Sequence, residues 1–90
     1  MDAQALKATG NAHFAKGEDQ KAIDAYTAAL DKTNDAPLRV AILSNRAACH
    51  QQIREPERAL QDTLHVLTFD PQNEKSLKRR QVYEQILKGM

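Results

Sequence analysis

The sequence predicts an all-α protein in which helical hairpins stack side by side. The main observation is an internal repeat with an offset of 37 residues, which pairs Leu6 with Leu43, Ala12 with Cys49, His13 with His50, Ala22 with Ala59 and Leu30 with Leu67. A repeat of this length is typical of stacked helix–turn–helix units. Apolar residues also recur at helical spacing, and no segment alternates as a strand would. We therefore expect two hairpins and a C-terminal fifth helix.

The first hairpin is expected over residues 2–36, with helices at about 2–16 and 19–33. Gly17 lies between them and suits the positive φ that often ends a helix. The run Asn34-Asp35-Ala36-Pro37 then ends the second helix and opens a loop.

The second hairpin is expected over residues 37–73, with helices at about 37–53 and 56–69. The run Arg54-Glu55-Pro56-Glu57 forms its turn, because proline suits the first turn of a helix. Asp70-Pro71 ends the fourth helix, since the residue before a proline avoids helical geometry.

A fifth helix is expected over residues 73–88. A further step of 34 residues takes Leu43 to Leu77, so this segment begins a third unit. Its charge differs from the rest, because residues 74–90 carry five basic and two acidic side chains, a net charge of +3.

The repeat units resemble a known family. The matching residues of the first unit are Gly10, Gly17, Ala22, Tyr26 and Ala29. The second unit carries Ser44-Asn45-Arg46-Ala47-Ala48-Cys49, then Ala59-Leu60 and Asp70-Pro71. This pattern resembles the tetratricopeptide repeat (TPR). The second unit departs from it at Arg54, where a turn glycine is usual, and at Thr63, where an aromatic residue is common. The resemblance covers nearly all 90 residues and implies a single TPR domain.

Composition excludes several classes of protein. The chain has no apolar run of about 18 residues and no signal peptide, so we expect neither a membrane span nor secretion. Its single cysteine permits no internal disulfide, which suits the cytoplasm. The net charge of +1 and the four aromatic residues (Tyr 2, Phe 2) argue against nucleic-acid binding, even through the basic fifth helix.

Five polar residues form the candidate binding site. Lys7 and Asn11 share one face of the first helix, Lys75 and Arg79 repeat this spacing on the fifth helix, and Asn45 lies on the third. Lysine supplies a point charge, arginine a planar fork and asparagine directional donors, a set that suits two neighbouring carboxylates. An aspartate at the C-terminus of a peptide carries both.

This set resembles the dicarboxylate clamp of chaperone-binding TPR domains, which grips the C-terminal Glu-Glu-Val-Asp of the 70- and 90-kDa heat-shock chaperones. The resemblance implies that Lys7, Asn11 and Asn45 hold the terminal carboxylate, while Lys75 and Arg79 serve the aspartate side chain and nearby backbone. It also implies a co-chaperone adaptor that needs no cofactor and catalyses no reaction.

Residues beside the clamp complete this hypothesis. Phe14 and Ala48 fall on the same face and would form an apolar pocket for the peptide's valine or a residue before it. Gln51 lies where an upstream peptide residue would pass. Neither the clamp nor Gln51 predicts which of the two chaperone classes is preferred.

Other interpretations remain open at this point. Each clamp lysine alone would be an ordinary exposed side chain, Asn45 alone would tie down a loop or a neighbouring helix, and Arg79 alone would pair with Glu84 or Asp70. A second function is structural assembly or weak self-association through the apolar residues of the fifth helix, which are Val82, Tyr83, Ile86 and Leu87.

The remaining reactive side chains indicate packing. His13 and His50 occupy equivalent repeat positions, so we expect them between paired helices rather than in a metal site. Cys49 replaces a small residue on the third helix and is expected to be a packed thiol. His65 is expected at the surface or at a helix interface. No nucleophile–base motif or phosphate loop is present in the sequence.

Overall fold

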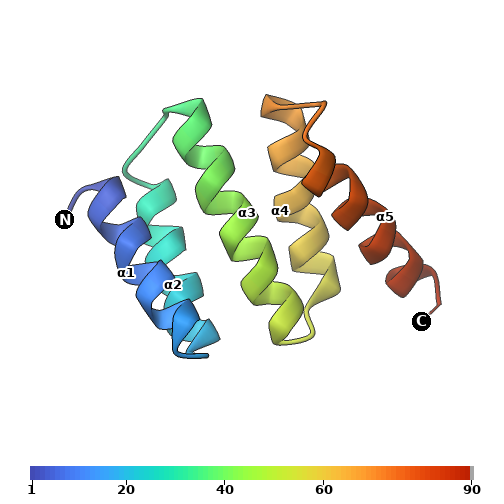
Figure 1. Cartoon of the computed structure of the whole chain (residues 1–90), viewed down its shortest axis with the longest axis horizontal. Helices are drawn as coiled ribbons and strands as arrows, with labels where there is room; N and C mark the ends of the chain where they lie inside the picture. Colours follow the sequence, from blue (N-terminus) through green and yellow to red (C-terminus); the bar gives the residue numbers. More distant parts are fainter. Residues whose placement is uncertain (90) are drawn as a thin grey trace.

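The computed structural model describes residues 1–89, which form five helices joined by short turns (Figure 1). The helices are α1 (Ala3–Ala15), α2 (Asp19–Leu30), α3 (Ala36–Gln52), α4 (Pro56–Phe69) and α5 (Glu74–Lys88). Residues 1–89 contain no strand, so the predicted all-α class is confirmed. Within the same range, no helix has the length and the apolar character that crossing a bilayer requires.

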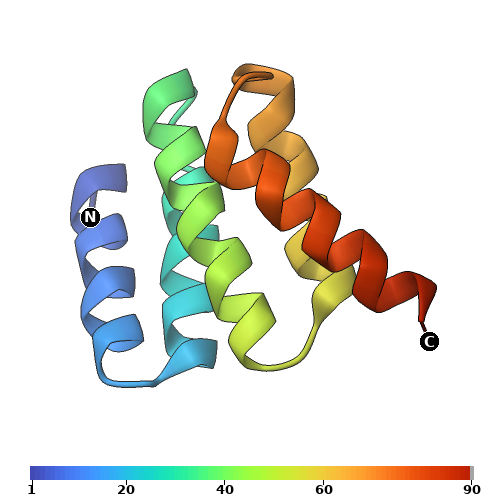
Figure 2. The ribbon, with the colours of Figure 1, turned by 45° about the vertical axis from the view of Figure 1, so that its right-hand side comes forward.

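The helices are arranged in two layers. Helices α1 and α2 form one hairpin, α3 and α4 form the next, and α5 packs against α4. Figure 2 shows α3 in front of α2 and α5 in front of α4, so α1, α3 and α5 share one side of the molecule. The array measures 40 × 27 × 17 Å, as expected of units that contact only their neighbours.

The core lies between the two layers, and the first hairpin closes tightly around one tyrosine. Tyr26 of α2 is fully buried, together with Ile42 and Leu43 of α3 and Val66 of α4. A Cβ atom at Gly10 of α1 would lie 2.5 Å from the Cε1 atom of the Tyr26 ring. Glycine is therefore required there for α1 and α2 to approach each other.

Short polar side chains begin three of the helices. The carboxylate of Asp2 accepts from the Ala5 amide at 2.8 Å, and that of Asp35 accepts from the Leu38 amide at 3.0 Å. The Asn73 side chain accepts from the Ser76 amide at 2.9 Å. Each bond satisfies a backbone donor that the first helical turn leaves free, which fixes where α1, α3 and α5 begin.

The first hairpin turn ends α1 with a left-handed residue. Gly17 has φ = 75°, as its position in the sequence predicted. The Glu18 amide donates to the His13 carbonyl at 2.9 Å, the bond that closes a helix C-terminus of this type. The Glu18 carboxylate also reaches His13 Nδ1 at 3.0 Å, so the expected packing histidine links α1 to the turn.

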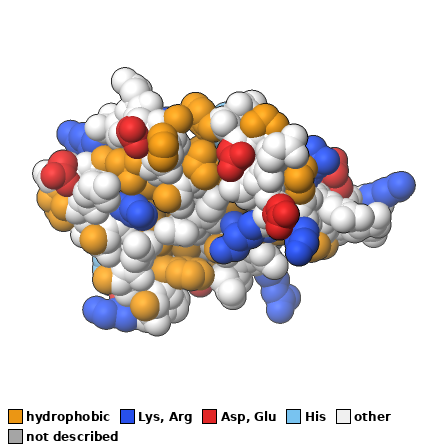
Figure 3. All heavy atoms as spheres, turned by 45° about the horizontal axis from the view of Figure 1, so that its top comes forward, with side chains coloured by type: hydrophobic (Ala, Val, Ile, Leu, Met, Phe, Trp, Pro, Cys, Tyr) orange, Lys and Arg blue, Asp and Glu red, His pale blue; other side chains and the backbone are white. Residues whose placement is uncertain are grey.

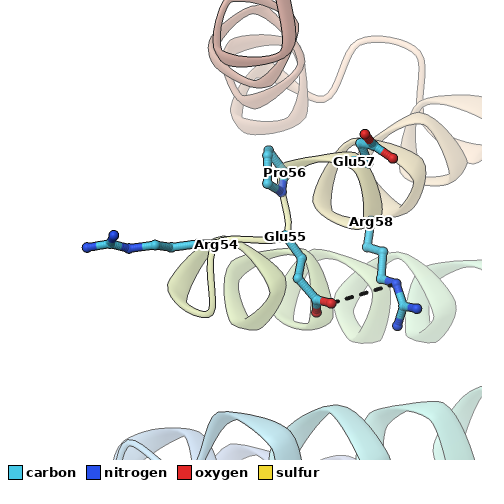
Figure 4. Close-up of a pocket in the computed structure, with 5 residues that line it drawn as sticks. All are labelled: Arg54, Glu55, Pro56, Glu57 and Arg58. Carbon is cyan, nitrogen blue, oxygen red and sulfur yellow. Dashed lines mark ion pairs between the residues drawn. The ribbon is translucent and has the colours of Figure 1, made fainter. Parts of the chain in front are cut away.

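The second hairpin turn repeats this geometry without glycine (Figure 4). Arg54 has φ = 61°, the left-handed value that Gly17 adopts in the first turn. The Glu55 amide donates to the His50 carbonyl at 2.8 Å, and the Glu55 carboxylate lies 3.2 Å from His50 Nδ1. The departure noted at Arg54 therefore concerns the residue and leaves the fold of the turn unchanged.

Helix α2 ends earlier than predicted, at Leu30 rather than at residue 33. The guanidinium of Arg39 in α3 donates to the Leu30 carbonyl and to the Thr33 carbonyl, each at 2.8 Å. Because a side chain from the next helix satisfies these two carbonyls, α2 can end at Leu30, although helix propensity alone would extend it to residue 33.

A partly buried ion pair joins the two helices of the second hairpin, and its arginine also contacts the first hairpin. Arg46 of α3 makes two bonds to the Asp62 carboxylate of α4, at 2.8 Å from Nε and 2.7 Å from Nη2. Its Nη1 atom also donates to the Thr27 hydroxyl of α2 at 3.1 Å. The planar guanidinium thus connects three helices around the segment of α3 that carries Asn45.

Candidate ligand-binding face

Helices α1, α3 and α5 carry all five predicted clamp residues on the side of the molecule that they share. We call this the α1–α3–α5 face. Lys7 and Asn11 are one turn apart on α1, and Lys75 and Arg79 are one turn apart on α5. Asn45 lies on α3 between them.

Two side chains fix the amide of Asn11. Its Oδ1 atom accepts from the Tyr26 hydroxyl at 2.5 Å and from Asn45 Nδ2 at 3.0 Å. Both acceptor positions of this oxygen are therefore used. Within residues 1–89 the Asn11 Nδ2 group makes no hydrogen bond, and the residue is exposed. The site thus holds an oriented amide donor with its hydrogens free for an external acceptor.

The tyrosine beneath this amide is a permanent donor at neutral pH. Burial raises the pKa of Tyr26 to about 12, so its hydroxyl keeps its proton. The oxygen of Asn11 consequently stays directed at Tyr26 and Asn45, because turning the amide would break both bonds and set its NH₂ group against that of Asn45.

Arg79 crosses from α5 to α3. Its Nη1 atom donates to the carbonyl of Ser44 at 3.0 Å, directly before Asn45 in the chain. The guanidinium is therefore placed beside the two asparagines, and it pairs with neither Glu84 nor Asp70. Arg80 makes the contact to Glu84 instead, at 3.8 Å.

The two lysines flank this central group. Lys7 is half-buried one turn before Asn11, and Lys75 is exposed one turn before Arg79. Neither forms an ion pair with any residue in the range 1–89. Figure 3 shows several basic side chains grouped right of centre on the face that it draws, around one acidic side chain. The arrangement leaves positive charge and amide donors available to an anion.

The apolar residues predicted for the site occupy matching positions. Phe14 is 36% exposed and lies one turn after Asn11, and half-buried Ala48 lies one turn after Asn45. Phe14 therefore lies on the same face of α1 as Asn11, and Ala48 lies on the same face of α3 as Asn45.

The fold is that of a known repeat family. The second TPR of Spaghetti (RPAP3), solved bound to the HSP90 peptide SRMEEVD, superposes with a TM-score of 0.86 and 26% sequence identity. The similarity covers 97% of this chain and 78% of that one. The first TPR of the same protein, bound to the same peptide, gives a TM-score of 0.82 and 26% identity, covering 97% and 68% of the two chains.

The chain belongs to the tetratricopeptide repeat family. No protein-family model matches the sequence of this TPR chain. It is 40% identical over 74 residues to the heat-shock protein cognate co-chaperone sgt12 of Aspergillus fumigatus, and 36% identical over 88 residues to the unc-45 homolog B of Danio rerio. It is also 41% identical over 83 residues to a DnaJ subfamily C member 7 homolog of Schizosaccharomyces pombe.

The TPR chain spans only part of these relatives. The matches cover 82%, 94% and 91% of this chain, but 21%, 9% and 17% of the respective relatives. The similarity therefore concerns one TPR segment within longer proteins.

One sequence expectation about α5 was wrong. Tyr83 was grouped with the apolar surface that would bind a partner, but it is fully buried and its hydroxyl donates to Gln51 Oε1 of α3 at 2.8 Å. Val82 and Ile86 are 49% and 42% exposed. Their spacing from Arg79, three and seven residues, continues the clamp stripe instead of forming a separate face.

Sequence reasoning also missed the polar anchors. Tyr26 and Tyr83 each send a hydroxyl to a side chain of the α1–α3–α5 face, Asn11 and Gln51 respectively. The only signal in the sequence was tyrosine rather than phenylalanine at a core position, since a buried phenol needs a polar partner.

The other reactive residues take structural positions. Cys49 is fully buried, and burial raises its pKa to about 11, so the thiol is a poor nucleophile. Across residues 1–89, no three His, Cys, Asp or Glu side chains come together as a metal site would require. His50 is buried and held by Glu55, while His65 is exposed.

Proposed function

We propose that this TPR domain is a co-chaperone adaptor that binds the C-terminal Glu-Glu-Val-Asp of the 70- and 90-kDa heat-shock chaperones in the cytoplasm. The domain comprises repeat one over residues 2–36, repeat two over 37–73 and a terminal helix over 73–88. It acts as a protein–protein interaction module without catalysis or a cofactor. The binding groups are Lys7, Asn11, Asn45, Lys75 and Arg79.

The observation that carries this proposal is the oriented amide of Asn11. Its oxygen is occupied by Tyr26 and Asn45, so the group can only donate toward the exterior. A carboxylate is the natural acceptor, since charged acceptors form the stronger hydrogen bonds. Asn45 and Lys7 adjoin the same point, which provides the terminal carboxylate with several donors.

The second carboxylate of a terminal aspartate would meet α5. Arg79 is already held beside Asn45 by the Ser44 carbonyl, so little side-chain entropy is lost when it binds. Lys75 lies one turn away and adds a mobile ammonium group. Phe14 and Ala48 offer apolar contact to the valine that precedes the aspartate.

The comparisons support this choice of ligand. Both solved TPRs were bound to the HSP90 peptide SRMEEVD, which ends in Glu-Glu-Val-Asp, and one relative is named a co-chaperone. These facts concern the other proteins, and the five side chains of this chain provide matching chemistry for the same kind of peptide end.

Calorimetric titration tests the proposal with a peptide ending in Glu-Glu-Val-Asp and with its C-terminally amidated twin. We expect micromolar binding of the free acid and loss of binding in the amide, because amidation removes one carboxylate. Lys7→Ala or Arg79→Ala should each cost ~2–5 kcal/mol, enough to abolish measurable binding while helicity is kept. Lys16→Ala, an exposed lysine at the end of α1, is the matched control and should bind normally. Equal affinity for acid and amide would refute the clamp.

Self-association through α5 is a second candidate function, which the exposure of Val82 and Ile86 favours. Because these residues continue the stripe of Lys75 and Arg79, a dimer formed on them would cover part of the peptide site. Sedimentation velocity should then detect a dimer that saturating peptide dissociates. A monomer at every protein concentration would exclude this function.

A further inference from the structure

Arg54 is an exposed arginine in a backbone conformation that favours glycine. Its φ of 61° matches the 75° of Gly17 at the equivalent turn, so a glycine would be less strained there. None of the ion pairs within residues 1–89 includes Arg54. Figure 4 shows its side chain extending away from Glu55 and Arg58, which pair with each other. A strained residue without an internal partner points to a role in binding.

Arg54 borders a hollow at one end of the α1–α3–α5 face. The hollow has a volume of about 370 Å³, and its other lining residues are Gln51, Pro56, Tyr83 and Ile86. Arg54 is the one charged side chain in this lining. A charge beside an apolar wall is less screened by water than one on an open surface, so it discriminates more strongly between ligand charges.

The hollow lies along the same pair of helices as the proposed clamp. Side chains bridge α5 and α3 at two levels, from Arg79 to Ser44 and from Tyr83 to Gln51, which lies two turns further along α3. Arg54 follows Gln51 where α3 turns into α4. A ligand held at Arg79 and extended beside α3 therefore reaches Arg54 at its far end.

The spacing determines which ligand residue meets Arg54. From Asn45 to Arg54 the chain advances nine residues, roughly 13 Å at 1.5 Å per helical residue. An extended peptide covers that distance in about four residues at ~3.3 Å each. The residue four or five places before the C-terminal residue thus lies closest to the guanidinium.

We propose that Arg54 determines specificity by selecting peptides with an acidic residue, and disfavouring those with a basic residue, four or five places before the C-terminal aspartate. This inference rests on the proposed clamp function. It makes the HSP90 peptide SRMEEVD, which has arginine at that place, a poorer ligand than a peptide of the same length with glutamate there.

Two free-acid peptides test the assignment on the whole chain: Ser-Arg-Met-Glu-Glu-Val-Asp and Ser-Glu-Met-Glu-Glu-Val-Asp. We expect the glutamate peptide to bind roughly 3- to 10-fold more tightly at low salt, as one exposed attraction replaces one repulsion. High salt should reduce this ratio, because exposed charges are screened. Calorimetry measures both constants.

Variants at Arg54 separate its charge from its effect on the fold. Arg54→Gly should raise the melting temperature and bring the affinity ratio close to one, so lost selectivity would not reflect unfolding. Arg54→Lys should keep the preference, and Arg80→Gln, an exposed arginine paired with Glu84, is the matched control that should leave it unchanged.

The outcomes distinguish this inference from the function on which it rests. Equal binding of the two peptides by the wild-type chain, or a preference that survives Arg54→Gly, overturns the role of Arg54 while the clamp stands. If neither free-acid peptide binds, the clamp fails and the assignment of Arg54 fails with it.

Discussion

The hydroxyl of Tyr26 should determine both the stability of the first hairpin and the affinity for a carboxylate. Tyr26→Phe removes the donor that lies 2.5 Å from Asn11 Oδ1 and keeps the ring that packs on Gly10. Asn45 still donates to the same oxygen, so no buried acceptor is left unpaired. The loss should therefore be that of one ordinary hydrogen bond, about 1 kcal/mol. In a domain of this size it lowers the melting temperature by about 4–8 °C.

The effect on binding depends on how freely the side-chain amide of Asn11 can turn over. Without Tyr26 only Asn45 opposes the turned orientation of Asn11, so a fraction of the molecules presents oxygen instead of NH₂ to the ligand. If half of them do so, the apparent Kd doubles. We expect a two- to fivefold loss of affinity, roughly, compared with at least ~30-fold for Asn11→Ala, which removes the donor itself.

Fluorescence anisotropy with a labelled Glu-Glu-Val-Asp peptide and thermal melts measure the two effects. Tyr83→Phe is the matched control: it also removes a hydroxyl from a fully buried tyrosine, but its partner Gln51 is not one of the five clamp residues. Its melting temperature should fall similarly while Kd stays constant. An unchanged Kd in Tyr26→Phe would refute the reasoning, because the tyrosine would then support only the fold.

Three further changes probe the fold that carries the site. Gly10→Ala places a Cβ atom 2.5 Å from the facing tyrosine ring and should cost about 1–3 kcal/mol in denaturant titration; a neutral result would mean that the hairpin can open. Asp62→Ala leaves Arg46 charged and unpaired, so unfolding should become easier by about 3 kcal/mol, measured in the same way. Hydrogen bonding to His13 and Lys21 lowers the pKa of Glu18 below 4.5, so its contribution is present above that pH and is lost as the pH falls through the lower, folded value. Melts between pH 6 and pH 3 should therefore show a smaller decline for Glu18→Gln than for the wild type.

The helices were predictable because their ends depend on local chemistry. Gly17 marked the first turn, Pro56 began α4 within the position expected, and Asp70 ended it. The exception was the end of α2, where the guanidinium of Arg39 satisfies two carbonyls. Such a bond between successive helices leaves no trace in helix propensity, so the sequence alone placed this boundary three residues too late.

The placement of the candidate site residues was predictable to the level of helix faces and no further. The spacing of Lys7 from Asn11 and of Lys75 from Arg79 follows from the helical period, and the internal repeat places Asn45 on the helix between them. The bonds that orient these groups depend on how neighbouring helices approach each other. For that reason Tyr83 appeared as exposed surface in the sequence, although packing buries it.

The proposed binding groups lie on α1, α3 and α5, one helix in each successive unit of the array. A repeat array holds together through contacts between neighbours, so its end units open before its centre. A peptide bound by all three helices would be a noncovalent cross-link from the first unit to the last. It would slow amide hydrogen exchange at both ends of the array, and the effect would grow with the fraction of domains that carry peptide. In that state the bound peptide would carry part of any force applied along the array, and the domain would resist a pulling force best while it is occupied.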